Sequence, residues 1–429
     1  FGSLGDGSND RSLREQEASV LRFIGADGMP FNTLFDLLEL DLTKSKDGRS
    51  PDAACITSAY VESYQQLEKY EGFLHQSSWK SSLVASSWDG ASVMSGDKSG
   101  VAAKIKELAS HHISIHAVAH VHQLALGDAF VLVEYYSEWR SVMQEVYVYY
   151  NGSGKKRFAL EQIANELDAT LLKIKGTHGI RWAASLQNAV KALVTDVQTI
   201  AVDLELTAKS ALGIELTLLT DSEAFLRKSW KQKFEATEPG KRATYWKAVV
   251  DSIVEPRAAV AANDEFTIRY SNGETLEMKK SELLAQLSET DERLDTHPQW
   301  ELRSKLIQVR FLGYSCFMLD VYSELAILSK AFQSNSLIIS DVSKNVVKCL
   351  RALKKLTDKP GSMEAWFNAE CAKSEHANVL ATCQLELSDG DEERLADDRK
   401  STIEALVSHI EQRYTKVLDH PVLQAFAVF

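Results

Sequence analysis

The spacing of apolar residues changes near residue 165 of this 429-residue chain. Before that point, short apolar runs bounded by turn residues alternate with helical spacings. This predicts three strands, then a helix, a strand, a helix, a strand and a helix. Beyond it, apolar residues recur three and four positions apart almost throughout, which predicts helices. We therefore expect an α/β unit over residues 1–165 and a helical unit over residues 166–429.

Within the helical unit, LIQVRFLGYSCFMLDVYSELAILSKAFQ (306–333) is the most apolar run and is predicted to be a central buried helix. Ser401, three residues before Glu404, predicts the start of the last helix through a capping box. One segment departs from the helical pattern. EFTIRYSNGETLEM (265–278) alternates apolar and polar residues about Asn272-Gly273, which predicts a small β-hairpin.

Basic residues gather around Trp230 and Trp246 in the same part of the chain. They could form a local basic patch, although the solvated face of an amphipathic helix is the more ordinary interpretation. The residues concerned are Lys228, Lys231, Lys233, Lys241, Arg242 and Lys247.

Composition limits the classes of function. Apolar residues make up 45% and charged residues 25%, as in a soluble globular protein. The net charge of −12 argues against a protein whose whole surface binds phosphate groups. We see no apolar run of about 18 residues, so we expect no membrane span. The five dispersed cysteines suit free thiols in a reducing compartment. Because the chain opens with Phe1 and without a leader pattern, we expect it to be part of a longer protein.

Two aspartates occupy similar settings after short apolar runs: Asp6 in FGSLGDGSND and Asp89 in SSLVASSWDG. Asp-Gly is a common turn dipeptide, which is the ordinary interpretation. The alternative is that these carboxylates lie where α/β folds place their chemistry, at the ends of central strands. Two such aspartates can hold magnesium, and a pair of ions can clamp both oxygens in phosphoryl transfer. The five histidines between residues 111 and 122 fit no standard zinc spacing, so we expect structural or surface roles for them.

Several runs, taken in order, resemble the hAT (hobo–Activator) transposase superfamily: DGASVMSGDKSGVAAKIKE, ISIHAVAHVHQLALGDAF and GTHGIRWAASLQNAV. DGSNDRSLREQEASVLRFI resembles the family's first catalytic strand and the strand after it. LDVYSELAILSKAFQ resembles a helix of its insertion domain. The resemblance covers most of the chain. It implies a ribonuclease H-like core with an Asp–Asp–Glu triad, interrupted by an all-helical insertion domain.

The resemblance assigns the first catalytic aspartate to Asp6, with Asp10 as the alternative, and the second to Asp89. Both would bind Mg²⁺ or Mn²⁺. The third residue, a glutamate, has no match in this chain, and neither has the family's C-terminal dimerisation region. The family's Cys-x-x-His element falls on Ala117 and His120, so its cysteine is lost. We therefore expect catalysis to be incomplete or lost.

Arg181 and Trp182 match an Arg-Trp pair at the start of the family's insertion domain. There the indole would stack on a displaced DNA base and the guanidinium would meet phosphate. Packing of Trp182 into the domain junction is the alternative. The implied function is cleavage and transfer of DNA strands in the nucleus, acting on transposon ends or hairpins. A homo-oligomer would form through a region beyond this chain. The alternative function is a domesticated scaffold or regulatory interaction protein without catalysis.

Overall fold

The computed structural model describes most of the chain. The described residues are 1–9, 15–48, 50–70, 74, 77–89, 92–96, 98–176, 183–212, 229–234, 244–253, 265–270, 275–279, 294–335, 337–373, 379–380, 383–419 and 424.

A five-stranded mixed sheet forms the first part of the fold. Its strands are β1 (Gly2–Asn9), β2 (Glu15–Ile24), β3 (Pro30–Glu39), β4 (Ala85–Trp88) and β5 (Ile113–His116). The order is β3-β2-β1-β4-β5, which puts β1 at the centre. β1, β2 and β3 pair antiparallel, whereas β4 runs parallel to β1 and β5 parallel to β4.

Helices connect and cover these strands in the predicted order. They are η1 (Leu42–Lys44), α1 (Ala53–Leu67), α2 (Trp79–Ser82), α3 (Ser92–Ser95) and α4 (Val101–Leu108). α1 begins at the N-cap Asp52, whose carboxylate accepts from the amides of Ala54 and Cys55. Its buried tyrosines, Tyr60 and Tyr64, pack under the sheet. The predicted order of strands and longer helices is confirmed, and α2 and α3 are short additions.

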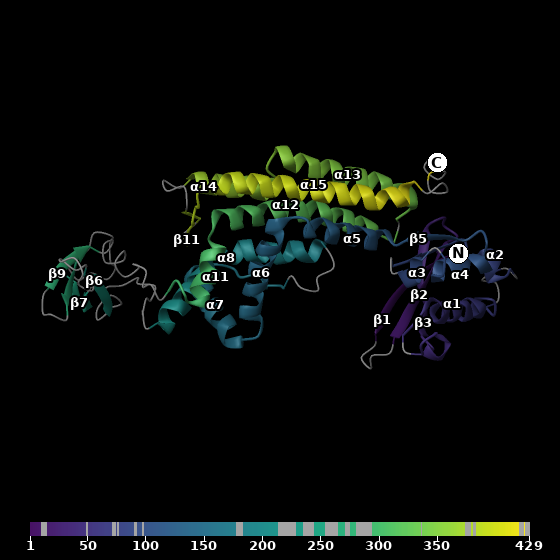
Figure 1. The fold of residues 1–429 in the computed structure, drawn as a ribbon, viewed down its shortest axis with the longest axis horizontal. Coiled ribbons are helices and arrows are strands. Elements are labelled where there is room, and N and C mark those ends of the chain that lie inside the picture. The colour runs from purple at the N-terminus through teal and green to yellow at the C-terminus, as the bar shows by residue number, and fades with distance from the viewer. Residues whose placement is uncertain are drawn as a thin grey trace.

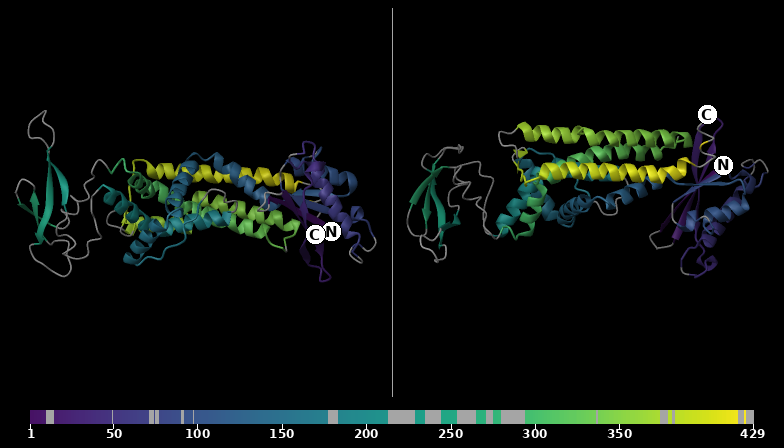
Figure 2. Two further views of the ribbon diagram at one scale, coloured as in Figure 1. Left: turned by 90° about the horizontal axis from the view of Figure 1, so that it is seen from below. Right: turned by 45° about the horizontal axis from the view of Figure 1, so that its top comes forward.

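The rest of the chain is mostly helical. The helices are α5 (Val118–Val131), α6 (Glu134–Asn151), α7 (Gly154–Glu166), α8 (Ala183–Ala211), α11 (Pro298–Leu306), α12 (Val309–Phe332), α13 (Ile339–Asp358), α14 (Ser362–Lys373) and α15 (Asp391–Leu418). Most run lengthwise, with the five-stranded sheet at one end (Figures 1 and 2). Buried side chains of α5, α6 and α7 join the same hydrophobic cluster as those of the later helices, separate from the cluster beneath the sheet. The boundary expected at residue 165 stays a prediction.

α12 is the predicted central helix, and the structure confirms this. Among the described residues it is the one helix whose length and composition would allow it to cross a membrane. However, 78% of its most apolar window is buried inside the fold. It packs against α8, α13, α14 and α15, as the core helix of a bundle does.

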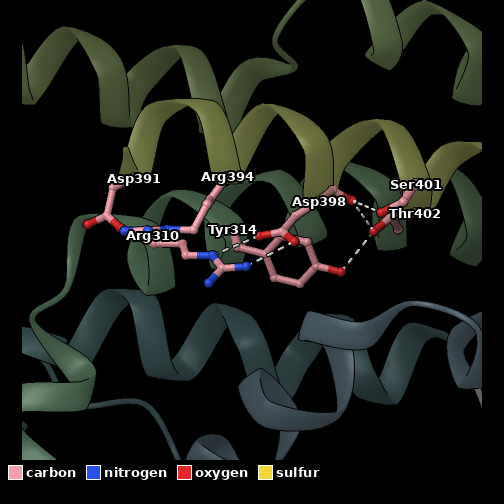
Figure 3. Close-up of polar contacts among 7 residues, drawn as sticks. All are labelled: Arg310, Tyr314, Asp391, Arg394, Asp398, Ser401 and Thr402. Atoms are coloured by element: carbon pink, nitrogen blue, oxygen red, sulfur yellow. Dashed lines mark hydrogen bonds and ion pairs between the residues drawn. The ribbon is translucent and has the colours of Figure 1, made fainter. Parts of the chain in front are cut away.

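The prediction that the last helix starts near Ser401 is wrong, because α15 begins ten residues earlier at Asp391. The left-handed Gly390 precedes it, and acidic residues in its first turn interact favourably with the helix dipole. Ser401 instead lies inside the helix, where its hydroxyl donates to the carbonyl of Asp398 at 3.1 Å. The Asp398 carboxylate accepts two hydrogen bonds from Arg310, which tie α15 to α12 (Figure 3).

A second sheet lies at the far end of the helical part from the first (Figure 1). Its strands pair antiparallel in the order β6-β7-β8-β9. They span β6 (Ser229–Phe234), β7 (Thr244–Ile253), β8 (Glu265–Tyr270) and β9 (Thr275–Lys279). β8 and β9 occupy the region where a hairpin was predicted, and its Asn272-Gly273 turn lies outside the described residues.

The helix interpretation of the basic cluster is wrong for Lys231, Lys233 and Lys247. The first two belong to β6 and the third to β7, where Lys231 pairs with Lys247. The other basic residues of the cluster lie outside the described part of the chain: Lys228, Lys241 and Arg242. A further two-stranded pair joins β10 (Val379–Leu380) to β11 (Cys383–Gln384).

Candidate carboxylate site at one end of the sheet

The pairing of β1 with β4 brings the two predicted aspartates toward the same end of the sheet. In this parallel register Leu4 pairs with Ser87, the residue before Trp88. The pairing ends there; continued for two more residues, this register would set Asp6 opposite Asp89, which directly follows β4. Because strand residues alternate between faces, both aspartates occupy positions on the face that Leu4 and Ser87 share.

The glycines on either side of Asp6 explain why this strand tolerates bulky neighbours on its other face. A Cβ atom at Gly5 would lie 2.5 Å from Cδ1 of Trp88 and closer still to the hydroxyl of Tyr60. A Cβ atom at Gly7 would lie 2.9 Å from Oε1 of Glu17. The two glycines therefore let two rings and a carboxyl group pack directly against β1. Asp6, on the opposite face, is exposed to solvent.

Glu17 is a third carboxyl group at this end of the sheet. Glu17 lies on β2, where it pairs with Gly7 of β1. Its side chain is 6% exposed and accepts a hydrogen bond from the Tyr60 hydroxyl at 3.1 Å. Burial raises its pKa to about 7; the Tyr60 hydrogen bond opposes this shift, and the charges of Asp89 and Asp6 add to it. The charges of both aspartates thus act on one carboxyl group, although Glu17 occupies the opposite face.

Our sequence reasoning missed Glu17, although a signal for it exists. Glu17, Ser19 and Leu21 alternate along β2, and all three are buried on the face toward α1. Because Leu21 identifies this as the core face, the same alternation places a glutamate inside. Such a buried carboxyl beside other acids is a common mark of functional sites.

Histidines follow the neighbouring strand. His116 ends β5 and pairs with Trp88, and its ring lies 5.4 Å from that of His120. Burial lowers the pKa of His116; His120 and Arg413 lower it further, while Asp89 raises it. His112 is a buried structural residue, as predicted, because its Nε2 lies 2.7 Å from the Ser86 hydroxyl. Burial lowers the pKa of His112 to about 4, which keeps this imidazole neutral.

The carboxylates suit a magnesium ion better than a metal held entirely by protein. Within the described part of the chain, no group of three or more His, Cys, Asp or Glu residues is placed to hold a metal ion. Asp6 and Asp89 supply two oxygen donors, and Mg²⁺ commonly takes one or two carboxylates together with waters and substrate phosphate.

The other predicted site residues lie outside the described residues: Asp10, Arg181 and Trp182. A comparison with known protein families found no family model that matches the chain.

Proposed function

We propose that this chain is a DNA-processing protein derived from an hAT-type transposase, in which Asp6 and Asp89 hold Mg²⁺ or Mn²⁺ against a DNA phosphate. The observation that carries the proposal is the parallel pairing of β1 with β4, whose register, continued past Leu4 and Ser87, would set Asp6 opposite Asp89. The strand order β3-β2-β1-β4-β5 supports a ribonuclease H-like core, which requires aspartates on the first strand and after the fourth. Nuclear localisation and assembly into a homo-oligomer belong to the same proposal.

The two aspartates would orient the metal ion at the exposed face of the sheet, where a DNA backbone has access. When bound, the ion would supply Lewis-acid stabilisation of the phosphate and lower the pKa of a coordinated water. Glu17 cannot complete the same coordination shell from its position on the opposite, buried face. With only two carboxylates, we expect weak metal binding and no cleavage above background.

A second candidate function is a domesticated scaffold that binds partners without catalysis. The observation that favours it is the lack, among the described residues, of a group of three metal-ligating side chains. The two candidates differ in one measurable property: only the first requires a divalent ion to bind at Asp6 and Asp89.

Manganese binding, measured by water-proton relaxation, tests the proposal directly. Asp6→Asn and Asp89→Asn should each weaken binding by about tenfold or more, since changes even to groups that only support a metal ligand cost about that much. Glu107→Gln, an exposed carboxylate on α4, is the matched control and should change nothing. Equal binding in the wild type and in both aspartate variants would reject the site in favour of the scaffold.

Cleavage of a DNA hairpin with Mg²⁺ or Mn²⁺ tests the second part of the proposal. We expect no nicking above background. Robust nicking that disappears in Asp89→Ala would contradict the expected incompleteness and would mean that this chain supplies its own third carboxylate.

A further inference from the structure

α13 carries a row of exposed cations on one face. Lys344, Lys348, Arg351 and Lys355 follow one another at spacings of four, three and four residues, and all four are exposed. Residues at these spacings lie above one another on a helix surface. We call this row the α13 stripe. The helix packs on α12 and α15 with its other side, and it lies along the outside of the helical part (Figures 1 and 2).

Most of the α13 stripe lacks internal charge compensation. Lys344 lies 3.6 Å from Asp341 and remains 78% exposed. The neighbouring Lys354, outside the stripe, is paired with Glu411 at 2.9 Å. For Lys348, Arg351 and Lys355, the described residues provide no side-chain hydrogen bond or ion pair.

The single sign of the stripe is unusual for a merely solvated helix face. The chain carries a net charge of −12, so a row of four cations with acids only at its two ends, Asp341 and Asp358, runs against its average composition. Like charges four residues apart destabilise a helix, and the stripe contains two such pairs. A solvated face would avoid this repulsion by mixing signs. A row of anions outside the protein would offset it.

The length of the stripe suits a nucleic-acid backbone. Eleven residues separate Lys344 from Lys355, which is about 16 Å along the helix axis. One strand of duplex DNA carries a phosphate about every 3.4 Å along its axis, so this length faces about five phosphates. Lysine and arginine contacts of this kind set position and affinity but read no base sequence.

The turn before α13 also contacts the five-stranded sheet, at the part of β2 that pairs with Gly2. Arg22 of β2 donates to the carbonyl of Leu337 at 2.6 Å, just before α13 begins, and Asn32 donates to Asn335 at 3.1 Å. By strand alternation, Arg22 occupies the same face of β2 as Ala18, which pairs with Asp6. A duplex lying along α13 would therefore run toward the sheet face that carries Asp6.

We propose that the α13 stripe binds the phosphate backbone of duplex DNA, without sequence preference, and directs it toward the carboxylate site. The choice of DNA as the polyanion rests on the proposed function; the stripe itself does not depend on metal binding or cleavage.

Fluorescence anisotropy with a labelled duplex several turns long, in the presence of EDTA, tests this proposal. The test variant is Lys348→Gln/Arg351→Gln/Lys355→Gln. The control is Lys155→Gln/Arg157→Gln/Lys173→Gln, which removes the same three charges from exposed residues of α7 and the segment after it. Figure 1 shows α7 and α13 on opposite sides of the helical part.

The logarithm of the DNA-binding constant falls as the logarithm of the salt concentration rises. In the test variant this fall should be shallower by about three, one for each lost phosphate contact. Between about 50 and 200 mM salt, the wild type should then lose roughly forty-fold more affinity than the variant. The control should keep nearly the wild-type slope. Neither variant should lower the melting temperature, because the substituted side chains are exposed. Equal losses in the two variants would overturn the proposal, since net charge alone would then explain binding.

Two further arms separate other partners and separate this proposal from the preceding one. Tighter binding of duplex RNA, or stripe-dependent binding to vesicles of phosphatidylcholine and phosphatidylserine, would overturn the assignment to DNA. The stripe variant should keep the wild-type affinity for manganese, because none of its three substituted residues belongs to the carboxylate site. If manganese binding fails while the stripe still controls DNA affinity, the proposed function falls and the stripe stands; the reverse result removes the stripe alone.

Discussion

Replacing Glu17 with glutamine should stabilise the five-stranded sheet at alkaline pH and leave it unchanged in acid. The pKa of Glu17 is raised from 4.5 to about 7, chiefly by burial, so the folded state holds this proton more tightly than the unfolded chain does. The resulting stabilisation is fully present below pH 4.5 and is lost as the pH rises through 7. By pH 8 the ionised carboxylate should cost about 3 kcal/mol relative to its protonated form.

Glutamine tests this reasoning because it removes the charge and keeps the shape. Its amide oxygen can still accept from the Tyr60 hydroxyl, now 3.1 Å from Oε2 of Glu17. The assay is hydrogen exchange of peptides from β1, β2 and α1, comparing variant and wild type at the same pH. Protection should be nearly equal near pH 4 and greater in the variant near pH 8, by up to about 3 kcal/mol of opening free energy.

The matched control is Glu15→Gln on the same strand, where the glutamate is exposed. It should not change the difference between the two pH values. If Glu17→Gln leaves protection at pH 8 at the wild-type level, burial does not destabilise the ionised carboxylate, and the raised pKa of Glu17 is wrong.

Two other changes follow from the same region. Gly5→Ala should destabilise the sheet by about 1–3 kcal/mol through overpacking, because its Cβ would overlap the buried Tyr60 hydroxyl. Adding Tyr60→Phe should recover part of that loss in urea unfolding, and a purely additive double variant would contradict the assigned clash. Trp182→Ala should weaken binding to a DNA hairpin or single-stranded end by roughly tenfold or more, with little change on plain duplex. Equal losses on both DNA forms, by anisotropy, would point to damaged folding instead of lost base stacking.

The order of elements in the first sheet could be predicted because turn residues punctuate it clearly. Gly25-Ala26-Asp27-Gly28 separates two apolar runs, and the structure places a turn there between β2 and β3. This order also allows β4 to pair parallel with an earlier strand, because a helical crossover precedes it, but the structure alone shows that this strand is β1. Local spacing therefore carried most of the information about this part of the fold.

The second sheet could be predicted only in part because its local signals conflict. The Asn272-Gly273 turn marks β8 and β9, but Trp230 and Trp246 stand among lysines that suit an exposed helix equally well. The period-two spacing of Lys231 and Lys233 was the available strand signal, and it spans too few residues to decide alone. β6 and β7 form strands because they pair with each other and with β8. A short stretch of sequence does not contain the partner strands, so its spacing alone could not predict this.

Glu17 was missed for a related reason: its importance depends on neighbours that only the folded sheet supplies. In the sequence it is one of two glutamates around Gln16. In the fold it pairs with Gly7 and accepts a hydrogen bond from the hydroxyl of Tyr60. The charges of Asp6 and Asp89 raise its pKa. The spacing predicted that two aspartates follow separate strands. Asp89 does follow β4, but the prediction is wrong for Asp6, which lies inside β1. The third carboxyl required the registry between β1 and β2.

Like charges gather in two places on this molecule, and each gathering is unfavourable in isolation. The charges of Asp6 and Asp89 both act on Glu17 at one end of the sheet, and the α13 stripe places basic side chains next to one another. A divalent ion would offset the first repulsion, and a row of phosphates would offset the second. The turn before α13 contacts the face of the sheet that carries Asp6, four residues along β2 from the position that pairs with Asp6. DNA with a metal ion on its backbone would offset both repulsions, because it brings the cation and the phosphates as one ligand.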